Sequence, residues 1–155
     1  ATTSQMISRL LTDDITGLNV LDMGCGTSIL AILARMRGAA HCLGIDVDEW
    51  CVKNSRENIQ LNHLDGIDVE LGDASSLAGQ GPFDLVIANI NLGILLNDLK
   101  HYVPCMKPGA YIYMSGFYDT DIPKLVAEAE RQGLKLTDEH VLDGWACLKL
   151  QKIEA

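Results

Sequence analysis

The segment Asp22-Met23-Gly24-Cys25-Gly26-Thr27-Ser28 decides the fold, because it joins a strand-like run to a helix-like run. Residues 19–23 form a short apolar stretch that is typical of a buried strand, and residues 28–36 form an Ala-rich apolar stretch that is typical of a buried helix. Two glycines let the backbone turn sharply and approach a ligand without a clash from Cβ. The pattern indicates a ligand-binding turn below a helix N-terminus, although a tight connection alone would also need glycines here.

Strand-like and helix-like segments alternate on both sides of this turn. We predict strands at residues 19–23, 41–45, 67–71, 83–88 and 110–115, and helices at residues 28–36, 48–62, 91–103 and around 122–129. A further helix opens the chain, with Thr2 or Thr3 as its expected N-cap. Pro108-Gly109 is expected to break the chain before the fifth strand. The alternation predicts an α/β fold with a mostly parallel sheet and helices on both faces.

The end of the chain has a different pattern. Residues 136–142 and 145–152 read as two strands around Asp143-Gly144, and a two-residue Asp-Gly link is typical of a tight hairpin. We therefore expect an antiparallel hairpin at one side of the parallel sheet.

Composition limits the class of protein. The 155 residues are enough for one domain, and the net charge of −9 argues against a surface that grips nucleic acid directly. The charge is compatible with a basic protein partner, or it serves solubility alone. The five cysteines are odd in number and form no CxxC pair, which is typical of free thiols in a reducing compartment.

Targeting and metal-binding signals are not found in the sequence. No segment resembles a signal peptide or reaches transmembrane length, so we predict a soluble cytoplasmic protein without a membrane partner. No group of His, Cys, Asp and Glu has metal-ligand spacing. The chain opens directly into helix-like sequence without Met, so we expect residues 1–155 to be a single domain from a longer protein.

Polar residues follow the second and third strands, at the end of a parallel sheet where ligands bind. Asp46 lies 22 positions after Gly24, close to the spacing at which an acid reaches a ribose. An N-cap is the alternative role, for which Asp48 is better placed. Asp73, in Gly72-Asp73-Ala74, could accept a hydrogen bond from an adenine amino group, or it could simply form a turn.

Asn89 follows the fourth strand inside an apolar run. A buried carboxamide needs hydrogen-bond partners, and it offers both a donor and an acceptor. Asn91 is the better helix cap of the two asparagines, so we predict that Asn89 faces the substrate.

Two kinds of nucleotide site compete for the glycine turn. A dinucleotide site of an NAD-dependent oxidoreductase requires G-x-G-x-x-G, but Ile29 stands where the third glycine should be. Asp22, Gly24 and Gly26 instead satisfy D-x-G-x-G, the pattern of the second kind of site. The predicted terminal hairpin also favours the D-x-G-x-G site over the dinucleotide site.

These motifs resemble those of class I S-adenosylmethionine-dependent methyltransferases. The resemblance rests on residues 22–26, 44–48, 72–74 and 83–90. More narrowly, residues 1–3, 29–32, 88–90 and 115–116 resemble bacterial methyltransferases that trimethylate a ribosomal protein of the large-subunit stalk base.

The resemblance implies a Rossmann-like seven-stranded sheet of order 3-2-1-4-5-7-6 with its last strand antiparallel. It also implies S-adenosylmethionine as cofactor and a basic ribosomal protein as substrate. The implied cofactor-binding residues are Thr3, Asp22, Gly24, Cys25, Gly26, Asp46, Val47, Asp73, Ala74 and Asn89.

The sequence departs from the family in two respects. Ser28 replaces the third glycine that many class members carry, and we expect this small residue to cap the following helix without loss of cofactor binding. The additional N-terminal domain that recruits the ribosomal protein is also missing from these residues, as is the segment expected just before Thr2.

The narrow resemblance implies lysine side-chain and α-amino groups as acceptors, and methyl transfer to an amine is an in-line displacement. The enzyme mainly aligns the amine with the methyl group, and Asn89 is the predicted catalytic residue that holds the amine by its carbonyl oxygen. Asn89 cannot act as a base, and none of the four histidines is indicated as one. Glutamine, RNA and small molecules are alternative acceptors, and a non-catalytic S-adenosylmethionine-binding module remains a second hypothesis.

Overall fold

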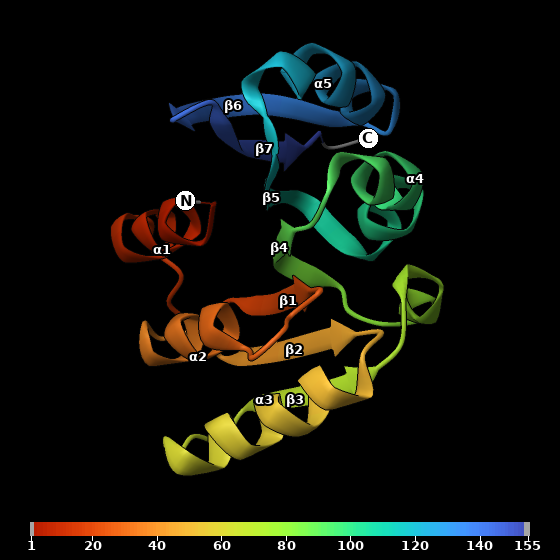
Figure 1. Cartoon of the computed structure of the whole chain (residues 1–155). Helices are drawn as coiled ribbons and strands as arrows, with labels where there is room; N and C mark the ends of the chain where they lie inside the picture. The colour runs from red at the N-terminus through yellow and green to blue at the C-terminus, as the bar shows by residue number, and fades with distance from the viewer. Residues whose placement is uncertain (1, 154–155) are drawn as a thin grey trace.

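A computed structural model describes residues 2–153, which form a seven-stranded sheet with helices on both faces (Figure 1). Ala1, part of the narrow motif above, lies outside the described residues. The strands are β1 (Asn19–Met23), β2 (His41–Asp46), β3 (Ile67–Leu71), β4 (Phe83–Asn89), β5 (Met106–Tyr118), β6 (Leu134–Leu142) and β7 (Trp145–Lys152). The helices are α1 (Thr2–Thr12), α2 (Ile29–Met36), α3 (Glu49–Leu61), α4 (Leu92–Tyr102) and α5 (Ile122–Arg131), with the 3-10 turns η1 (Ala74–Leu77), η2 (Val103–Cys105) and η3 (Asp119–Asp121).

The strand order is β3-β2-β1-β4-β5-β7-β6, which confirms the predicted order. β3, β2, β1, β4 and β5 run parallel, and β7 pairs antiparallel with both β5 and β6. The chain leaves β1 toward β2 on one side and returns as β4 on the other. This reversal creates a crevice at the carboxyl ends of β1 and β4, where ligands of open α/β sheets bind.

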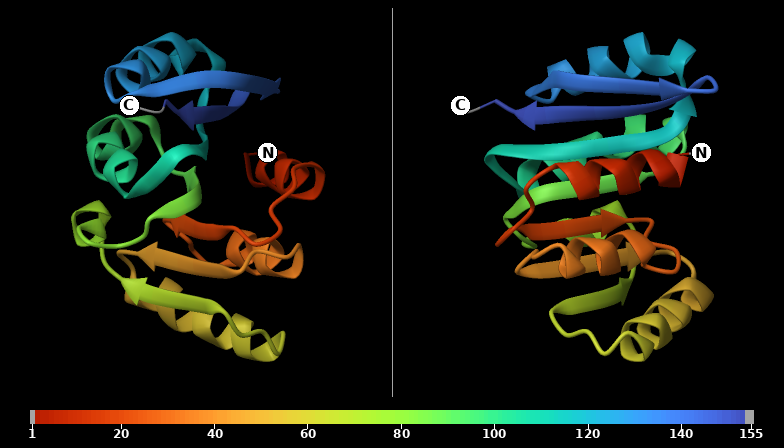
Figure 2. Two further views of the ribbon diagram at one scale, coloured as in Figure 1. Left: turned by 180° about the vertical axis from the view of Figure 1, so that it is seen from behind. Right: turned by 90° about the vertical axis from the view of Figure 1, so that its left-hand side faces the viewer.

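Helices lie on both faces of the sheet (Figure 2), and an apolar layer holds them on each face. α1 and α2 pack on one face through buried residues such as Met6, Leu10 and Ala31, and α3 joins them over β3. α4 and α5 cover the opposite face through residues such as Leu99 and Leu125. Within residues 2–153, no helix combines the length and the apolar character that a membrane crossing requires.

The predicted break at Pro108-Gly109 is wrong, because both residues lie inside β5. The pairing with β4 jumps from Met106 to Tyr111, so residues 107–110 form a wide irregularity in one continuous strand. Pro108 has no N–H for the ladder and Gly109 has a φ of 82°, which together explain a local interruption that does not end the strand.

The terminal hairpin forms as predicted. Asp143 and Gly144 have φ values of 52° and 80°, and positive values at both central residues are the mark of a tight two-residue hairpin turn. The turn directs β7 back along β5, so that the sheet ends in β6 as an edge strand.

Candidate functional site

A crevice opens at the carboxyl ends of β1 to β4, and we call it the glycine-loop crevice. It contains a cavity of about 130 Å³ lined by Met23, Gly24, Ile45, Asp46, Val47, Gly72, Asp73, Ala74, Ile90, Ile94 and Asp98. The structure therefore brings together five residues that the sequence selected from three separate loops: Gly24, Asp46, Val47, Asp73 and Ala74. Cavities that enclose a drug-sized ligand measure about 300–1,000 Å³, so this one holds only part of such a ligand.

The glycine turn reaches Ile90 across the crevice. Gly24 has a φ of 65°, and a Cβ built there would lie 3.2 Å from Cγ1 of Ile90. Any side chain at this position would be strained in its backbone and crowded against the Ile90 side chain, directly after β4. The close approach of the two strand ends therefore requires glycine.

Ser28 precedes α2 with a φ of 65° and makes no side-chain capping hydrogen bond. The expectation that Ser28 caps the helix is therefore wrong. A positive φ favours glycine, which gives a physical reason for the third glycine found in many members of the class.

Asp46 ties the glycine turn to the loop after β2. One carboxylate oxygen accepts the Gly26 N–H at 2.9 Å, and the other accepts the Asp48 N–H at 2.9 Å. Asp48 in turn caps α3 by accepting the Trp50 N–H at 2.9 Å, as the sequence indicated. Each oxygen of Asp46 retains lone-pair capacity for a ligand hydroxyl beside the cavity.

Asp73 both forms a turn and lines the crevice. Its Oδ1 accepts hydrogen bonds from the backbone N–H and the hydroxyl of Ser75, which caps η1. These hydrogen bonds from the Ser75 side chain and backbone lower the pKa of Asp73. The carboxylate is therefore available in its charged form as an acceptor at neutral pH.

Asp22 and Cys25 lie behind the crevice and do not line it. Asp22 is 2% exposed, its Oδ2 has no hydrogen-bond partner, and burial raises its pKa to about 7. Cys25 is also buried, with its Sγ 4.0 Å from the Ser55 hydroxyl, and burial raises its pKa to about 11. Neither side chain is therefore exposed to a ligand in the crevice, whereas the Gly26 N–H donates to Asp46.

Asn89 joins two hydroxyl-bearing residues next to the crevice, and we call Thr3, Asn89 and Ser115 the Asn89 cluster. The Asn89 Nδ2 donates to the Thr3 Oγ1 at 3.3 Å, and the Ser115 Oγ donates to the Asn89 Oδ1 at 3.1 Å. Thr3 lies inside α1, so its expected role as N-cap is wrong. Asn91 caps α4 by accepting the Ile94 N–H at 3.1 Å, which leaves Asn89 free of that role as predicted.

Sequence reasoning missed the wall that α4 and the residue before its cap add to the crevice. Ile94 and Asp98 on α4, together with Ile90, line the cavity. Ile94 and Asp98 are four residues apart, so their shared face of the predicted helix was the available signal. Ser115 belongs to the short motif at residues 115–116, and nothing in its local sequence indicates contact with residue 89.

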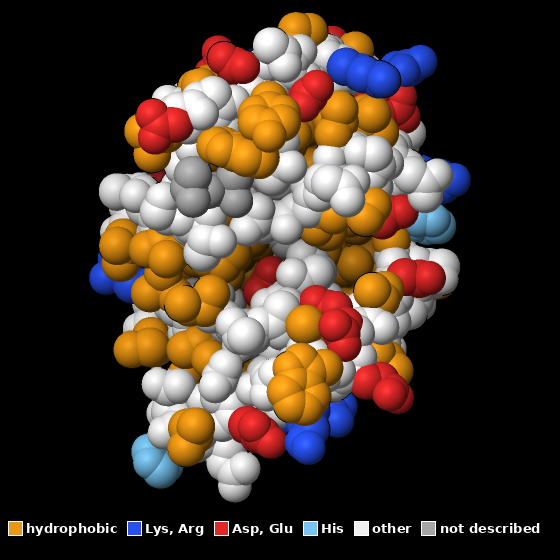
Figure 3. Space-filling model, in the orientation of Figure 1, with side chains coloured by type: hydrophobic (Ala, Val, Ile, Leu, Met, Phe, Trp, Pro, Cys, Tyr) orange, Lys and Arg blue, Asp and Glu red, His pale blue; other side chains and the backbone are white. Residues whose placement is uncertain are grey.

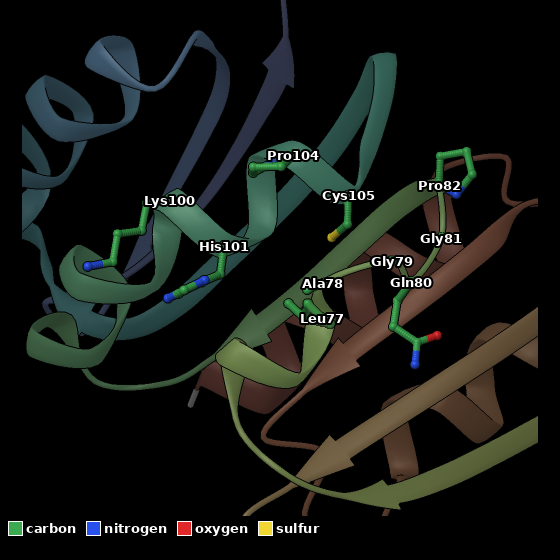
Figure 4. Close-up of a pocket in the computed structure, with 10 residues that line it drawn as sticks. All are labelled: Leu77, Ala78, Gly79, Gln80, Gly81, Pro82, Lys100, His101, Pro104 and Cys105. Carbon is green, nitrogen blue, oxygen red and sulfur yellow. The ribbon is translucent and has the colours of Figure 1, made fainter.

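A larger cavity of about 510 Å³ lies elsewhere, between the segment 77–82 and the residues from Lys100 to Cys105 (Figure 4). Pro82 and Cys105 stand directly before β4 and β5, which places that part of its lining at the amino ends of these strands. Ligands of open α/β sheets bind at the opposite ends. The smaller crevice is therefore the better candidate in spite of its size.

The side chains around the crevice are acidic or apolar. Figure 3 shows acidic and hydrophobic side chains near the middle of one face, whereas Lys and Arg lie toward its margins. In the part of the chain that the structure describes, no three His, Cys, Asp or Glu side chains come together in a way that could hold a metal ion.

Known proteins with a similar sequence and fold share this architecture. A family model described as ribosomal protein L11 methyltransferase (PrmA) matches residues 1–153. The chain is 60% identical over 148 residues to a ribosomal protein L11 methyltransferase of Bacteroides thetaiotaomicron, covering 96% of this chain and 53% of the relative. It is 51% identical over 148 residues to a protein of the same description from Porphyromonas gingivalis, covering 96% of this chain and 51% of that one.

The fold comparison agrees with the sequence comparison. A crystal structure of a ribosomal protein L11 methylase from Lactobacillus delbrueckii subsp. bulgaricus superposes with a TM-score of 0.91 at 24% identity, covering 99% of this chain and 79% of that one. The chain spans about half the length of the curated relatives it matches.

Proposed function

The chain belongs to the ribosomal protein L11 methyltransferase (PrmA) family, and from this premise we propose that it carries the catalytic site of an S-adenosylmethionine-dependent protein methyltransferase. The observation that carries the proposal is the convergence of Gly24, Asp46 and Asp73 on one crevice beside Asn89. We further propose that the acceptors are amino groups of ribosomal protein L11 and that the protein acts in the cytoplasm. All five cysteines are free, which supports a reducing compartment.

The residues of the crevice fit an adenosyl ligand. Asp46 presents two carboxylate oxygens to ribose hydroxyls, and Asp73 presents an acceptor to an adenine amino group. Val47 is 73% exposed and faces the same cavity as Ile90 and Ile94, which would cover the two faces of a flat ring. Gly24 leaves room for the part of the ligand that extends past the cavity.

When bound, S-adenosylmethionine supplies a methyl group on a positively charged sulfur, which is an activated leaving group. The chain's own task is then to align a neutral amine with that methyl group. Asn89 would accept a hydrogen bond from the amine on its carbonyl oxygen and so direct the nitrogen lone pair. A lysine amine has an ordinary pKa of about 10.4, and apolar surroundings favour its neutral form.

Cofactor identity is tested by calorimetry with S-adenosylmethionine, its demethylated product and NAD in parallel. We expect binding of the first two and none of NAD. Binding of NAD alone would overturn the proposal, since it would assign the crevice to an oxidoreductase.

Acceptor identity is tested by mass spectrometry of ribosomal proteins from cells with and without the full-length protein. We expect the methyl groups on L11 to disappear in its absence. Unchanged L11, together with normal binding of S-adenosylmethionine, would favour another acceptor or a non-catalytic binding module.

A further inference from the structure

The Asn89 side chain is held from both ends of its amide group. Ser115 on β5 donates to the carbonyl oxygen, and Thr3 on α1 accepts from the amino group. The two partners are unequal, because Ser115 is fully buried whereas Thr3 is half-buried in the first turn of a helix. Ser115 is therefore the more firmly placed of the two.

The backbone around Ser115 fixes its hydroxyl relative to β4. Ser115 and Asn89 are direct partners in the β4–β5 ladder, and the Ile90 N–H donates to the Ser115 carbonyl at 3.0 Å. The next residue, Gly116, has a φ of 103°, and a Cβ there would lie 2.7 Å from the Ile90 carbonyl oxygen. Only glycine permits this close approach, which locks the Ser115 position against the end of β4.

The remaining hydrogen-bond capacity of Asn89 is limited. A carboxamide accepts two hydrogen bonds and donates two. Ser115 occupies one acceptor position and Thr3 takes one donor, which leaves one acceptor and one donor. A neutral amine that attacks a methyl group needs an acceptor for its N–H, so the direction of the free carbonyl lone pair decides the geometry of attack. That direction is set by the hydrogen bond from Ser115.

We propose that Ser115 is a positioning residue for methyl transfer, which acts by orienting the Asn89 carbonyl toward the acceptor amine. This inference rests on the proposed function. Loss of the Ser115 hydroxyl leaves the amide held by Thr3 alone and free to turn. We expect this loss to lower kcat about tenfold, the effect of one buried hydrogen bond of about 1.4 kcal/mol, while the cofactor Kd stays unchanged.

The test compares Ser115→Thr with Ser115→Val in the full-length protein. The two side chains have the same shape, and only threonine keeps the hydroxyl. We expect Ser115→Thr to keep kcat near the wild-type value and Ser115→Val to lower it about tenfold, with equal Kd for S-adenosylmethionine in the two variants. Equal kcat values for the two variants would overturn the inference.

Threonine and valine are both larger than serine, and the buried site could fail to fold around them. A second test therefore uses the smaller alanine. Ser115→Ala is combined with Asn89→Ala in a double-mutant cycle on kcat. We expect Ser115→Ala to lower kcat in the wild-type background and to have no further effect once Asn89 is absent. Equal losses in both backgrounds would show that Ser115 does not act through Asn89.

The wild-type control separates this inference from the proposed function. A wild-type protein that binds no S-adenosylmethionine and methylates no L11 would overturn both. An active wild type with insensitive Ser115 variants would overturn only the positioning role.

Discussion

The glycine-loop crevice and the Asn89 cluster lie side by side but are held together in different ways. In the crevice, Asp46 and Asp73 accept hydrogen bonds from backbone N–H groups of adjacent loops. In the cluster, side chains bind side chains across 86 and 26 positions of the sequence. The hydrogen bonds of Asp46 and Asp73 therefore span at most 20 positions of the sequence, whereas the cluster also needs α1, whose Thr3 lies 86 positions from Asn89.

The largest expected effect tests the crevice. We predict that Asp46→Ala weakens S-adenosylmethionine binding about 1,000-fold. The substitution removes the two hydrogen bonds that the ribose hydroxyls would donate to the charged carboxylate, and each is worth roughly 1.5–3 kcal/mol. Calorimetry measures the change. Asp48→Ala is the matched control, since it removes the neighbouring carboxylate and its α3 cap, and it should cost about 1 kcal/mol of stability with near-normal binding. Wild-type affinity in Asp46→Ala would remove the ribose assignment.

The next effect tests the cluster. We predict that Asn89→Ala lowers kcat about 100-fold, on the order of the effect of one transition-state hydrogen bond, because the amine is no longer aligned. The Kd of the cofactor should change less than about threefold. Single-turnover kinetics in the full-length protein, combined with calorimetry, separates the two quantities. Asn91→Ala, which removes only the α4 cap, serves as control. Full activity of Asn89→Ala would show that the Asn89 cluster does not align the acceptor amine.

A third prediction concerns the buried carboxylate of Asp22, which precedes the glycine turn. Burial raises the pKa of Asp22 in the folded state to about 7, above its ordinary value of 3.8. The folded state therefore binds more protons than the unfolded state between pH 4 and pH 7, and Asp22 lowers stability progressively as pH rises through that window. We predict that Asp22→Asn raises the free energy of unfolding by about 2 kcal/mol at pH 8, roughly half the limit set by 1.36 kcal/mol for each pKa unit.

Urea unfolding of wild type and Asp22→Asn at several pH values checks this sign. The difference should be largest above pH 7 and should vanish near pH 4. Glu57→Gln, which neutralises an exposed carboxylate, is the matched control. A difference independent of pH would mean that Asp22 is charged in the folded protein throughout.

The smallest effect refines the description of the glycine loop. We predict that Ser28→Gly stabilises the protein by about 1 kcal/mol, because it relieves a left-handed backbone conformation at a residue that makes no capping bond. His63→Gly, at a second residue with positive φ (54°) and far from the crevice, is the matched control with a similar gain. Both are measured by chemical denaturation. Destabilisation by Ser28→Gly alone would show that its buried side chain contributes packing that outweighs the strain.

The same contrast explains how much the sequence could predict. The hairpin turn was predicted correctly, and the sequence also selected Gly24, Asp46 and Asp73 for one crevice, because each signal lies within a few residues of a strand end. The sheet order, also confirmed, was implied only by the resemblance to class I methyltransferases. Asp48 and Asn91 were identified as caps for the same reason. Local hydrogen bonds leave local signatures.

The roles that the sequence did not predict correctly depend on contacts between segments far apart in the chain. Pro108-Gly109 looked like a strand end because a sequence does not show that the ladder with β4 resumes beyond it at Tyr111. Thr3 looked like a cap until tertiary structure placed its hydroxyl against Asn89. Ser115 acquires a role only through its pairing partner on β4. Their roles depend on segments far away in the chain.

The hydrogen bond between Gly26 and Asp46 has a thermodynamic consequence for ligand capture. It joins the glycine turn to the β2 loop through groups of the protein itself, so the shape of the turn does not depend on a bond to the ligand. Fixing a free backbone costs roughly 1–2 kcal/mol for each residue. A turn that is rigid beforehand spares an incoming nucleoside that entropy loss, and the crevice can bind quickly with little rearrangement of its own.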